Sequence, residues 1–176
     1  MKKLSMEELG RISVDEFKAV EKLNLDLILD DIRSMSNVGS IFRTSDGFRV
    51  GKLYLCGITA TPPHREIEKT ALGATASVDW EYKEDALALV RALKQAGYKI
   101  LALEQADNST YLQNFRPIKD QKYALILGNE VFGVNEELIA EADEVIEIPQ
   151  FGTKHSFNVS VSAGMFLWDY FAKSIG

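Results

Sequence analysis

The sequence predicts an α/β fold, a mostly parallel β-sheet with helices on both faces. Three observations predict it. Segments with strand character alternate with segments of helical periodicity along the chain. Several strand segments, such as 25–29 and 123–127, are continuous apolar runs, which is typical of parallel strands buried on both faces. Polar residues and glycines follow these runs directly, at the ends of strands where ligands bind in open α/β sheets.

Strands are predicted where apolar and β-branched residues run up to an acid, a glycine or a proline. The first apolar run ends at Asp30, and the run at 123–127 stops at Gly128. The last segment, 145–148, alternates apolar and acidic residues and stops at Pro149. The predicted strands are 25–29, 52–58, 78–82, 99–103, 123–127 and 145–148.

Helices are predicted where apolar residues recur every three or four positions. The clearest one, 84–96, has a single apolar face and is followed by Gly97, which suits a C-cap. A helix after the first strand should have Ser36 or Asn37 as its N-cap and should end near Gly47. The other predicted helices are 65–72, 135–142 and one from about residue 158, whereas 105–121 is expected to be a loop.

The N-terminal segment 1–24 is polar and helix-prone, with one or two short amphipathic helices expected at 6–11 and 14–23. We expect it to form an extension that lies on the main domain or contacts a partner, with residues 25–176 forming one domain. The start, MKKLSMEELG, lacks the apolar core of a signal peptide, and no apolar run approaches the ~20 residues of a membrane span. A cytoplasmic protein without membrane contact is expected.

Composition excludes several classes of protein and of site. The 46% hydrophobic and 26% charged residues are those of a soluble globular protein. The single cysteine, Cys56, excludes an internal disulfide, and two isolated histidines, His64 and His155, form no metal-ligand cluster. A net charge of −6 argues weakly against a dedicated nucleic-acid binder, yet residues 31–75 carry six Lys/Arg and four Asp/Glu. Either a basic face or scattered solvated charges fit this count.

The segment 145–171 combines a strand, a polar loop and an amphipathic helix. Ser156 or Asn158 suits the N-cap of that helix, because either side chain can accept from the free backbone N–H groups of the first turn. Such a strand–loop–helix unit often presents backbone donors to a ligand, although it also occurs in units that only pack. The chain contains no GxGxxG pattern after its first strand, no P-loop and no GxSxG elbow, which disfavours ordinary nucleotide and hydrolase sites.

Four stretches of this chain resemble sequence motifs of the SpoU/TrmH family of RNA ribose 2′-O-methyltransferases, within the SPOUT superfamily. Residues 37–44 (NVGSIFRT) resemble its first motif, and 127–133 (LGNEVFG) its second. Residues 148–149 (IP) with 156–161 (SFNVSV) resemble its third, and 70–74 (TALGA) match a familiar stretch between the first two. The motifs come in family order and cover roughly residues 25–171. This chain departs from the pattern with Gln150 in place of Met and Phe157 in place of Leu, which implies a slightly altered cofactor pocket.

The resemblance implies a C-terminal trefoil knot that binds S-adenosylmethionine, and a homodimer with the knot at its interface. Periodicity alone does not reveal a knot, since true knots are rare. On this reading 145–171 is the threaded element. One face of its helix would pack against both the knot core and the partner subunit, or would simply pack in the core; it consists of Val159, Ala163, Phe166, Leu167 and Tyr170.

Five residues are candidates for the methyl transfer. Arg43 is the family's candidate for assisting the ribose hydroxyl; because a guanidinium stays protonated, we expect it to bind the adjacent phosphate and lower the hydroxyl pKa. Asn37 would orient that loop or contact the partner's site, and Glu130 would hold Arg43 or Asn37. Ser156 and Asn158 would bond the cofactor or the arginine loop. The alternatives are a surface ion pair for Arg43, a solvated acid for Glu130 and helix capping for the other three.

Further residues are implied as contacts of the ligands. The adenine ring should lie against backbone near Leu103, Gly128, Ile148 and Phe157. RNA contacts are expected from Arg43, Arg49 and Arg65. The full set of expected cofactor contacts is Leu103, Glu104, Gly128, Asn129, Gly133, Ile148, Pro149, Phe157 and Asn158.

The expected function is S-adenosylmethionine-dependent methylation of an RNA ribose 2′-hydroxyl by a homodimer. The short extension at 1–24 is similar to that of compact tRNA-modifying members, so tRNA is slightly favoured over rRNA; the nucleotide modified is not specified. One alternative is a catalytically silent knotted dimer that only binds RNA. Another is a small-molecule α/β enzyme with a nucleotide cofactor, against which the missing phosphate-loop glycines count.

Overall fold

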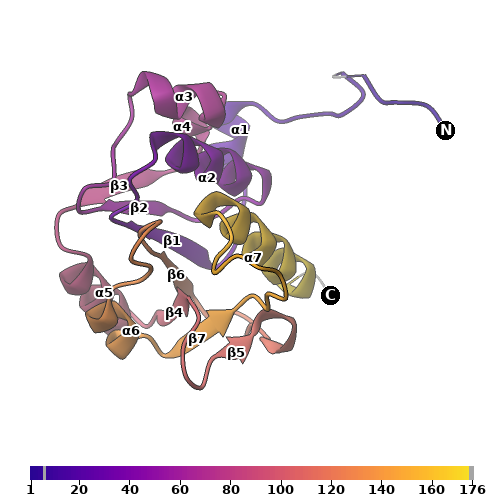
Figure 1. Ribbon diagram of the computed structural model, residues 1–176. Helices are drawn as coiled ribbons and strands as arrows, with labels where there is room; N and C mark the ends of the chain where they lie inside the picture. Colours follow the sequence, from indigo (N-terminus) through magenta and orange to yellow (C-terminus); the bar gives the residue numbers. More distant parts are fainter. Residues whose placement is uncertain (6, 175–176) are drawn as a thin grey trace.

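The computed structural model describes residues 1–5 and 7–174 and contains a seven-stranded sheet in the order β3-β2-β1-β6-β4-β7-β5 (Figure 1). Every pair of neighbouring strands is parallel. The α/β fold with a mostly parallel sheet, predicted from the sequence, is therefore confirmed. The strands are β1 (Leu25–Asp30), β2 (Leu53–Cys56), β3 (Trp80–Lys83), β4 (Lys99–Leu103), β5 (Thr110–Tyr111), β6 (Tyr123–Leu127) and β7 (Glu144–Glu147).

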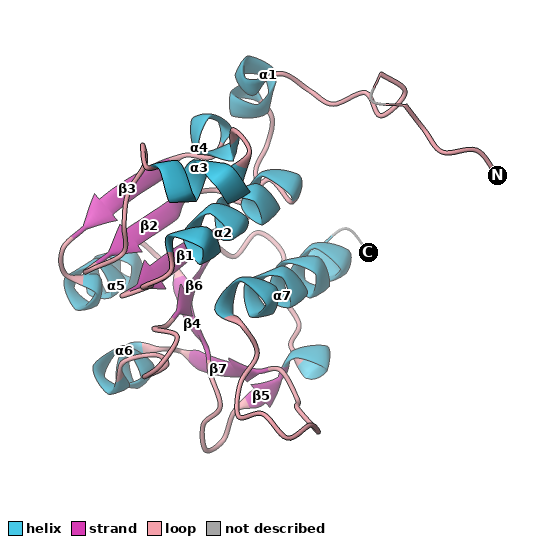
Figure 2. Cartoon of the chain, turned by 45° about the horizontal axis from the view of Figure 1, so that its top comes forward, coloured by secondary structure: helices cyan, strands magenta, loops and turns pink. Residues whose placement is uncertain are grey.

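Helices cover both faces of the sheet (Figures 1 and 2). The helices α2, α3 and α7 pack on one face, and α5 and α6 pack on the other. The N-terminal residues run away from the body of the domain before α1, which contacts α4 and buries Phe17. The helices are α1 (Val14–Ala19), α2 (Met35–Gly47), α3 (Arg65–Ala71), α4 (Ala74–Ser77), α5 (Ala86–Gln95), α6 (Glu136–Glu141) and α7 (Val159–Ser174), with a 3-10 turn η1 (Leu112–Asn114).

The central strand β1 shows why the apolar runs are continuous. Leu27 and Leu29 belong to the core under α2 and α7, whereas Ile28 belongs to the core under α5 and α6. Successive side chains of a strand point to opposite faces, and both faces are covered by helices. Leu29 pairs in register with Leu55 of β2 and Leu127 of β6. The neighbouring strands therefore also shield both long edges of β1 from solvent.

The order of the strands decides which loops meet. Strand β6 inserts between β1 and β4, which precede it in sequence, and β7 inserts between β4 and β5. The carboxyl ends of β1, β6, β4 and β7 therefore lie next to one another, and the polar segments that follow them converge. The trefoil knot implied by the resemblance stays a prediction.

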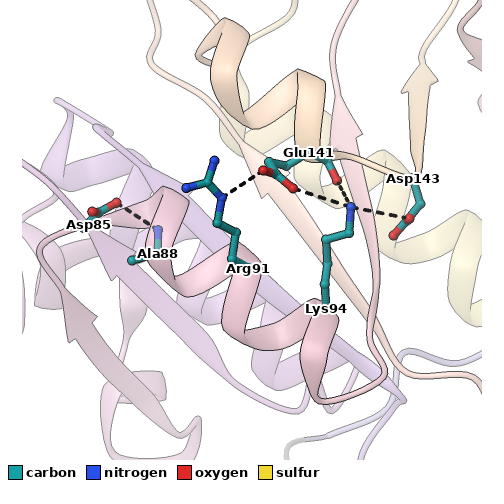
Figure 3. A network of polar contacts seen from close by, with 6 residues as sticks. All are labelled: Asp85, Ala88, Arg91, Lys94, Glu141 and Asp143. Carbon is teal, nitrogen blue, oxygen red and sulfur yellow. Dashed lines mark hydrogen bonds and ion pairs between the residues drawn. The ribbon is translucent and has the colours of Figure 1, made fainter.

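Polar contacts on the surface tie α5 to α6 (Figure 3). Arg91 Nε donates to Glu141 Oε1 at 2.9 Å, and Lys94 Nζ donates to the Glu141 carbonyl at 2.7 Å. Asp85 caps α5 by accepting from Ala88 N at 3.0 Å. Exposed ion pairs of this kind contribute about 0–1 kcal/mol each, so the buried face of α5 contributes most to holding it on the sheet.

The close approach of α2 and α3 explains one glycine of the first motif. A Cβ on Gly39 would lie 2.1 Å from Thr70 Oγ1 and 2.2 Å from the Ile67 carbonyl oxygen. Thr70 Oγ1 donates to the Ser36 carbonyl at 2.9 Å, which links the stretch 70–74 to the first motif. Only glycine allows this helix contact without displacing backbone.

Several predicted boundaries were wrong. The N-cap of α2 is Ser34, whose Oγ accepts from Asn37 N at 3.2 Å, and not Ser36 or Asn37. The chain turns at Asp31, which has φ 53°, so the helix begins two residues earlier than its apolar spacing suggests. In the predicted loop 105–121 the structure has β5 and η1, and α4 follows α3. Residues 7–11 form no helix, Met6 lies outside the described residues, and the predicted helix 14–23 is limited to α1.

Among residues 1–5 and 7–174, none of the helices has both the length and the apolar character needed to cross a membrane.

Candidate functional site

A cavity of about 620 Å³ opens at the carboxyl ends of β4, β6 and β7. Its wall is built from the segments that follow these strands and from the start of α7, so the convergence of strand ends creates it. The predicted residues that line the cavity are Leu103, Glu104, Gly128, Asn129, Glu130, Gly133, Ile148, Ser156, Phe157 and Asn158.

Three of the residues predicted for catalysis or cofactor binding do not line the cavity. Pro149 is half-buried and follows the end of β7 by two residues. Asn37 is buried in the first turn of α2, and Arg43 is exposed further along the same helix. The prediction that Pro149 contacts the cofactor therefore has no support from the geometry, and Asn37 is connected to the cavity only by its hydrogen bonds to other side chains.

Asn129 and Glu130 fasten the β6–α6 segment to the loop between β1 and α2. Asn129 Nδ2 donates to the Asp31 carbonyl at 2.8 Å. Glu130 Oε2 accepts from Arg33 N at 2.8 Å, and Glu130 Oε1 accepts from Ser34 N at 3.0 Å. These bonds satisfy backbone donors just before α2, so the second motif fixes the position at which the helix carrying Arg43 begins.

The acidity of Glu130 follows from the same contacts. Partial burial raises the pKa of its carboxyl group, but the hydrogen bonds from Arg33 N, Ser34 N and the Asn37 amide favour the ionised form more strongly. The net effect lowers the pKa of Glu130 below its ordinary value. Glu130 is therefore an ionised anchor at neutral pH, and its two oxygens are occupied by three donors.

The chain Glu130–Asn37–Asn158 connects all three motifs. Asn37 Nδ2 donates to Glu130 Oε1 at 3.0 Å, and Asn158 Nδ2 donates to Asn37 Oδ1 at 3.1 Å. Asn158 Oδ1 also caps α7, accepting from Ser160 N at 2.9 Å. Of the two predicted caps, Asn158 is thus confirmed, and the contact of Glu130 is with Asn37 rather than with Arg43. All of these contacts lie within one chain.

Glu104 and Gln105 brace the cavity from the end of β4. Glu104 Oε2 accepts from Val134 N at 3.0 Å, and Gln105 Nε2 donates to the His155 carbonyl at 2.9 Å. A Cβ on Gly133, where φ is +71°, would lie 2.2 Å from Glu104 Oε2. Glu104 therefore lines the cavity mainly as a support for the second motif. The sequence analysis did not single out Gln105, although its position directly after a strand was a signal.

The charged side chains that line the cavity are all acidic. Among the residues that the structure describes, its lining contains the carboxylates of Glu104, Glu130 and Glu136 but no lysine or arginine. The remaining lining consists of apolar side chains such as Leu103 and Leu127, of neutral polar side chains such as Ser156, and of the backbone of two glycines. Such a cavity suits a ligand with an apolar ring and a positive charge, and it disfavours a phosphate-bearing cofactor. The other lining residues that sequence reasoning missed include Val131, Phe132 and Ser162, whereas Gln150, expected to alter the cofactor pocket, does line the cavity.

The three predicted RNA-contacting arginines are all exposed. Arg43 lies on α2, Arg49 lies just after that helix with φ 54°, and Arg65 begins α3. Within the described part of the chain, Arg43 makes no ion pair, which contradicts the alternative of a surface ion pair. Its guanidinium is free to contact a ligand or a second chain.

Comparisons with known proteins agree with this geometry. The profile of the SpoU rRNA Methylase family matches residues 24–168. The tRNA (guanosine(18)-2′-O)-methyltransferase of Aquifex aeolicus is 33% identical over 86% of this chain and 72% of its own length. The 23S rRNA (guanosine-2′-O-)-methyltransferase RlmB of Neisseria meningitidis is 31% identical over 80% of this chain, which spans 55% of that enzyme.

Solved structures share the fold. The TrmH/SpoU tRNA modifying enzyme of A. aeolicus superposes with a TM-score of 0.80 over 91% of this chain and 81% of its own, at 24% identity. An AdoMet-bound rRNA methyltransferase from Sinorhizobium meliloti superposes with a TM-score of 0.78 over 87% of this chain and 58% of its own, at 25% identity. With the motifs assembled around one cavity and a family profile matching most of its length, the chain belongs to the SpoU rRNA methylase family.

Proposed function

We propose that this chain is an S-adenosylmethionine-dependent methyltransferase that modifies a ribose 2′-hydroxyl of RNA. The observation that carries the proposal is the cavity lined by three carboxylates and by no lysine or arginine. A sulfonium cation is favoured there, whereas the phosphates of NAD or ATP are not. The alternative of a small-molecule enzyme with a phosphate-bearing cofactor is therefore disfavoured.

The cavity has the size and chemistry to hold this cofactor. Its volume falls within the range of about 300–1,000 Å³ usual for such ligands. The adenine would lie among Leu103, Ile148 and Phe157, against the backbone at Gly128. A Cβ on Gly128 would lie 2.3 Å from Val134 N, so a larger residue would close this wall. The bound cofactor supplies a methyl group already activated by its positive charge.

The remaining task of the protein is to position the acceptor ribose and ease loss of its hydroxyl proton. Arg43, always protonated, would bind the phosphate beside that ribose and stabilise the developing alkoxide. Because Arg43 does not line the cavity of its own chain, we infer that it acts at the cavity of a partner subunit. Ser156 lines the cavity and would donate to or accept from the bound ligands. Asn37, Glu130 and Asn158 would position these groups through their mutual hydrogen bonds.

A homodimer is supported by the outer face of α7. Val161, Met165 and Trp168 are exposed at helical spacing on this face, with 61% of Trp168 accessible. Phe48, the half-buried C-cap residue of α2, adjoins this surface, with its ring centroid 6.3 Å from that of Trp168. The predicted partner face was different: of its five residues, Ala163, Phe166, Leu167 and Tyr170 are buried within this chain. The proposed interface therefore consists of Phe48, Val161, Met165 and Trp168.

We propose tRNA as the substrate. Relatives aligned over 86% and 92% of this chain, from A. aeolicus and Thermus thermophilus, are named as tRNA (guanosine(18)-2′-O)-methyltransferases. An rRNA enzyme is of similar identity over a shorter part of the chain, so the test must include both RNAs.

Labelled S-adenosylmethionine incubated with the protein and total tRNA, or total rRNA, tests the proposal directly. We expect label in tRNA at a linkage that resists alkaline cleavage, because that cleavage needs a free 2′-hydroxyl. Label in rRNA alone would replace the proposed substrate. Absence of label from both pools, with S-adenosylhomocysteine still bound, would favour the catalytically silent RNA-binding dimer. Absence of cofactor binding would contradict the proposal.

Replacing Gln105 by alanine should weaken S-adenosylhomocysteine binding by roughly 2–10-fold. The substitution removes the hydrogen bond at 2.9 Å that holds the His155 carbonyl, and such a bond contributes about 0.5–1.5 kcal/mol. Isothermal calorimetry measures the effect. Gln121→Ala is the matched control, because Gln121 Nε2 bonds the carbonyls of Gly97 and Lys122 outside the cavity wall. Equal affinities of the two variants would contradict a role for Gln105 in bracing the cavity.

A further inference from the structure

Phe132 is an exposed aromatic residue at the edge of the cavity. It lines the cavity while 85% of it is accessible to solvent. The other phenylalanine in the lining, Phe157, is 40% exposed and lies in the segment just before α7. Single exposed apolar residues are common on protein surfaces, so exposure alone assigns no role to Phe132. A role for Phe132 is indicated instead by its location at the cavity and by the rigidity of its backbone.

The turn that carries Phe132 is closed by four hydrogen bonds. Asn129 N donates to the Gly133 carbonyl at 3.0 Å, and Gly133 N donates to the Asn129 carbonyl at 2.9 Å. Asn129 Oδ1 accepts from Val131 N at 2.8 Å and from Phe132 N at 3.1 Å. The same asparagine is anchored to the Asp31 carbonyl. The backbone under the ring is therefore fixed before a ligand arrives, which lowers the entropic cost of using it as a contact.

The chemistry of the site limits how an RNA nucleotide can be held at the cavity. No lysine or arginine among the described residues lines it, so this chain offers no cationic side chain to a phosphate within it. The acceptor oxygen must come within about 3–3.5 Å of the methyl group, and the base on the same ribose must then lie at the edge of the cavity. Unstacked RNA bases are commonly held on aromatic side chains. Of the two phenylalanines that line the cavity, Phe132 is the more exposed and is available for this contact.

We propose that Phe132 is a stacking platform for the base of the nucleotide whose ribose is methylated. The inference rests on the proposed function and deepens it, since it names a residue that positions the acceptor. Stacking is tolerant of base identity, so Phe132 would contribute affinity and orientation rather than a choice between bases. Contact of the same ring with the cofactor is the competing reading, and the experiment separates the two.

The variants Phe132→Ala and Phe132→Tyr test the proposal beside Phe151→Ala. Phe151 is 97% exposed but does not line the cavity, which makes it a matched control for loss of a surface ring. We expect Phe132→Ala to raise KM for the RNA substrate by roughly 5–150-fold. The KM of Phe132→Tyr and of Phe151→Ala for the RNA should stay near that of wild type. The affinity for S-adenosylhomocysteine should stay near wild type in all three variants. Sedimentation of each variant checks that the oligomeric state is unchanged.

A substrate that lacks only the target base sharpens the test. An abasic ribonucleotide keeps its 2′-hydroxyl, so wild type should show on it the same rise in KM that Phe132→Ala shows on normal RNA. The variant should lose nothing further on the abasic RNA, because the two partners of one contact are coupled. Additive losses, an unchanged KM, or weaker S-adenosylhomocysteine binding would each overturn the inference. Failure of wild type to methylate any RNA would instead contradict the proposed function.

Discussion

Replacing Arg43 by alanine is expected to reduce methyl transfer to RNA by roughly 10²–10³-fold, with unchanged affinity for S-adenosylhomocysteine. Loss of one preorganised group that stabilises developing charge has an effect of this size. Cofactor binding should persist because the proposed contacts of Arg43 are with the RNA phosphate and the developing alkoxide, not with the cofactor. Arg91→Ala on α5 is the control, since it removes an exposed arginine and one surface ion pair with Glu141. Wild-type turnover by Arg43→Ala would exclude the proposed role.

Mixed dimers show on which subunit Arg43 acts. The second chain of the mixed dimer would carry Gly133→Phe, which places a ring at the cavity wall where φ is +71°. This variant is suitable once it is shown to form a folded dimer that binds no S-adenosylhomocysteine. Co-expression with Arg43→Ala should restore about a quarter of wild-type activity. About half of randomly mixed dimers contain one chain of each variant. In each of these dimers one of the two sites is complete, because the intact cavity of the Arg43→Ala chain meets the intact Arg43 of its partner. No activity above that of the separate variants would mean that Arg43 acts within its own chain.

The variant Glu130→Gln is expected to lower both stability and activity. The carboxylate of Glu130 accepts hydrogen bonds from Arg33 N, Ser34 N and the Asn37 side chain. In the amide, an NH2 group replaces one of the accepting oxygens, so at least one of these three donors faces another donor and loses its bond. The expected loss is about 1–3 kcal/mol in the free energy of unfolding, or roughly 3–10 °C in Tm. Turnover should fall at least about tenfold, because the same bonds position α2, which carries Arg43.

The stability difference between wild type and Glu130→Gln should depend on pH. The pKa of Glu130 is lower in the folded than in the unfolded chain, so the carboxylate stabilises the fold above the unfolded pKa of about 4.5. That contribution is lost as pH falls through the lower folded pKa. Thermal melts from pH 3 to 8 should therefore show a constant difference in the upper range and a shrinking one below. Glu137→Gln in α6, which also removes one negative charge, should show no such profile; a parallel profile would contradict the assignment.

The strands were predicted well because local sequence decides them. Strands β4 and β6 have the predicted bounds, since their apolar runs are flanked by clear stop signals. The start of α2 was misplaced because Ser34, Ser36 and Asn37 are all good caps by residue type, and the turn at Asp31 selects among them. The short strand β5 carries no periodicity of its own, and it forms because β7 offers it an edge.

By itself the sequence determined the parallel α/β fold, the family motifs and ten of the residues that line one cavity, because these depend on local patterns and residue types. The tertiary structure decided the roles of those residues. Strand β6 inserts between β1 and β4, so Glu130 meets the backbone before α2 and bonds Asn37, and Asn37 meets Asn158 across 121 positions of the chain. The same packing leaves Arg43 outside the cavity and Phe132 at its edge. No spacing encodes these contacts, since they arise where distant segments converge at the ends of strands that are neighbours only in space.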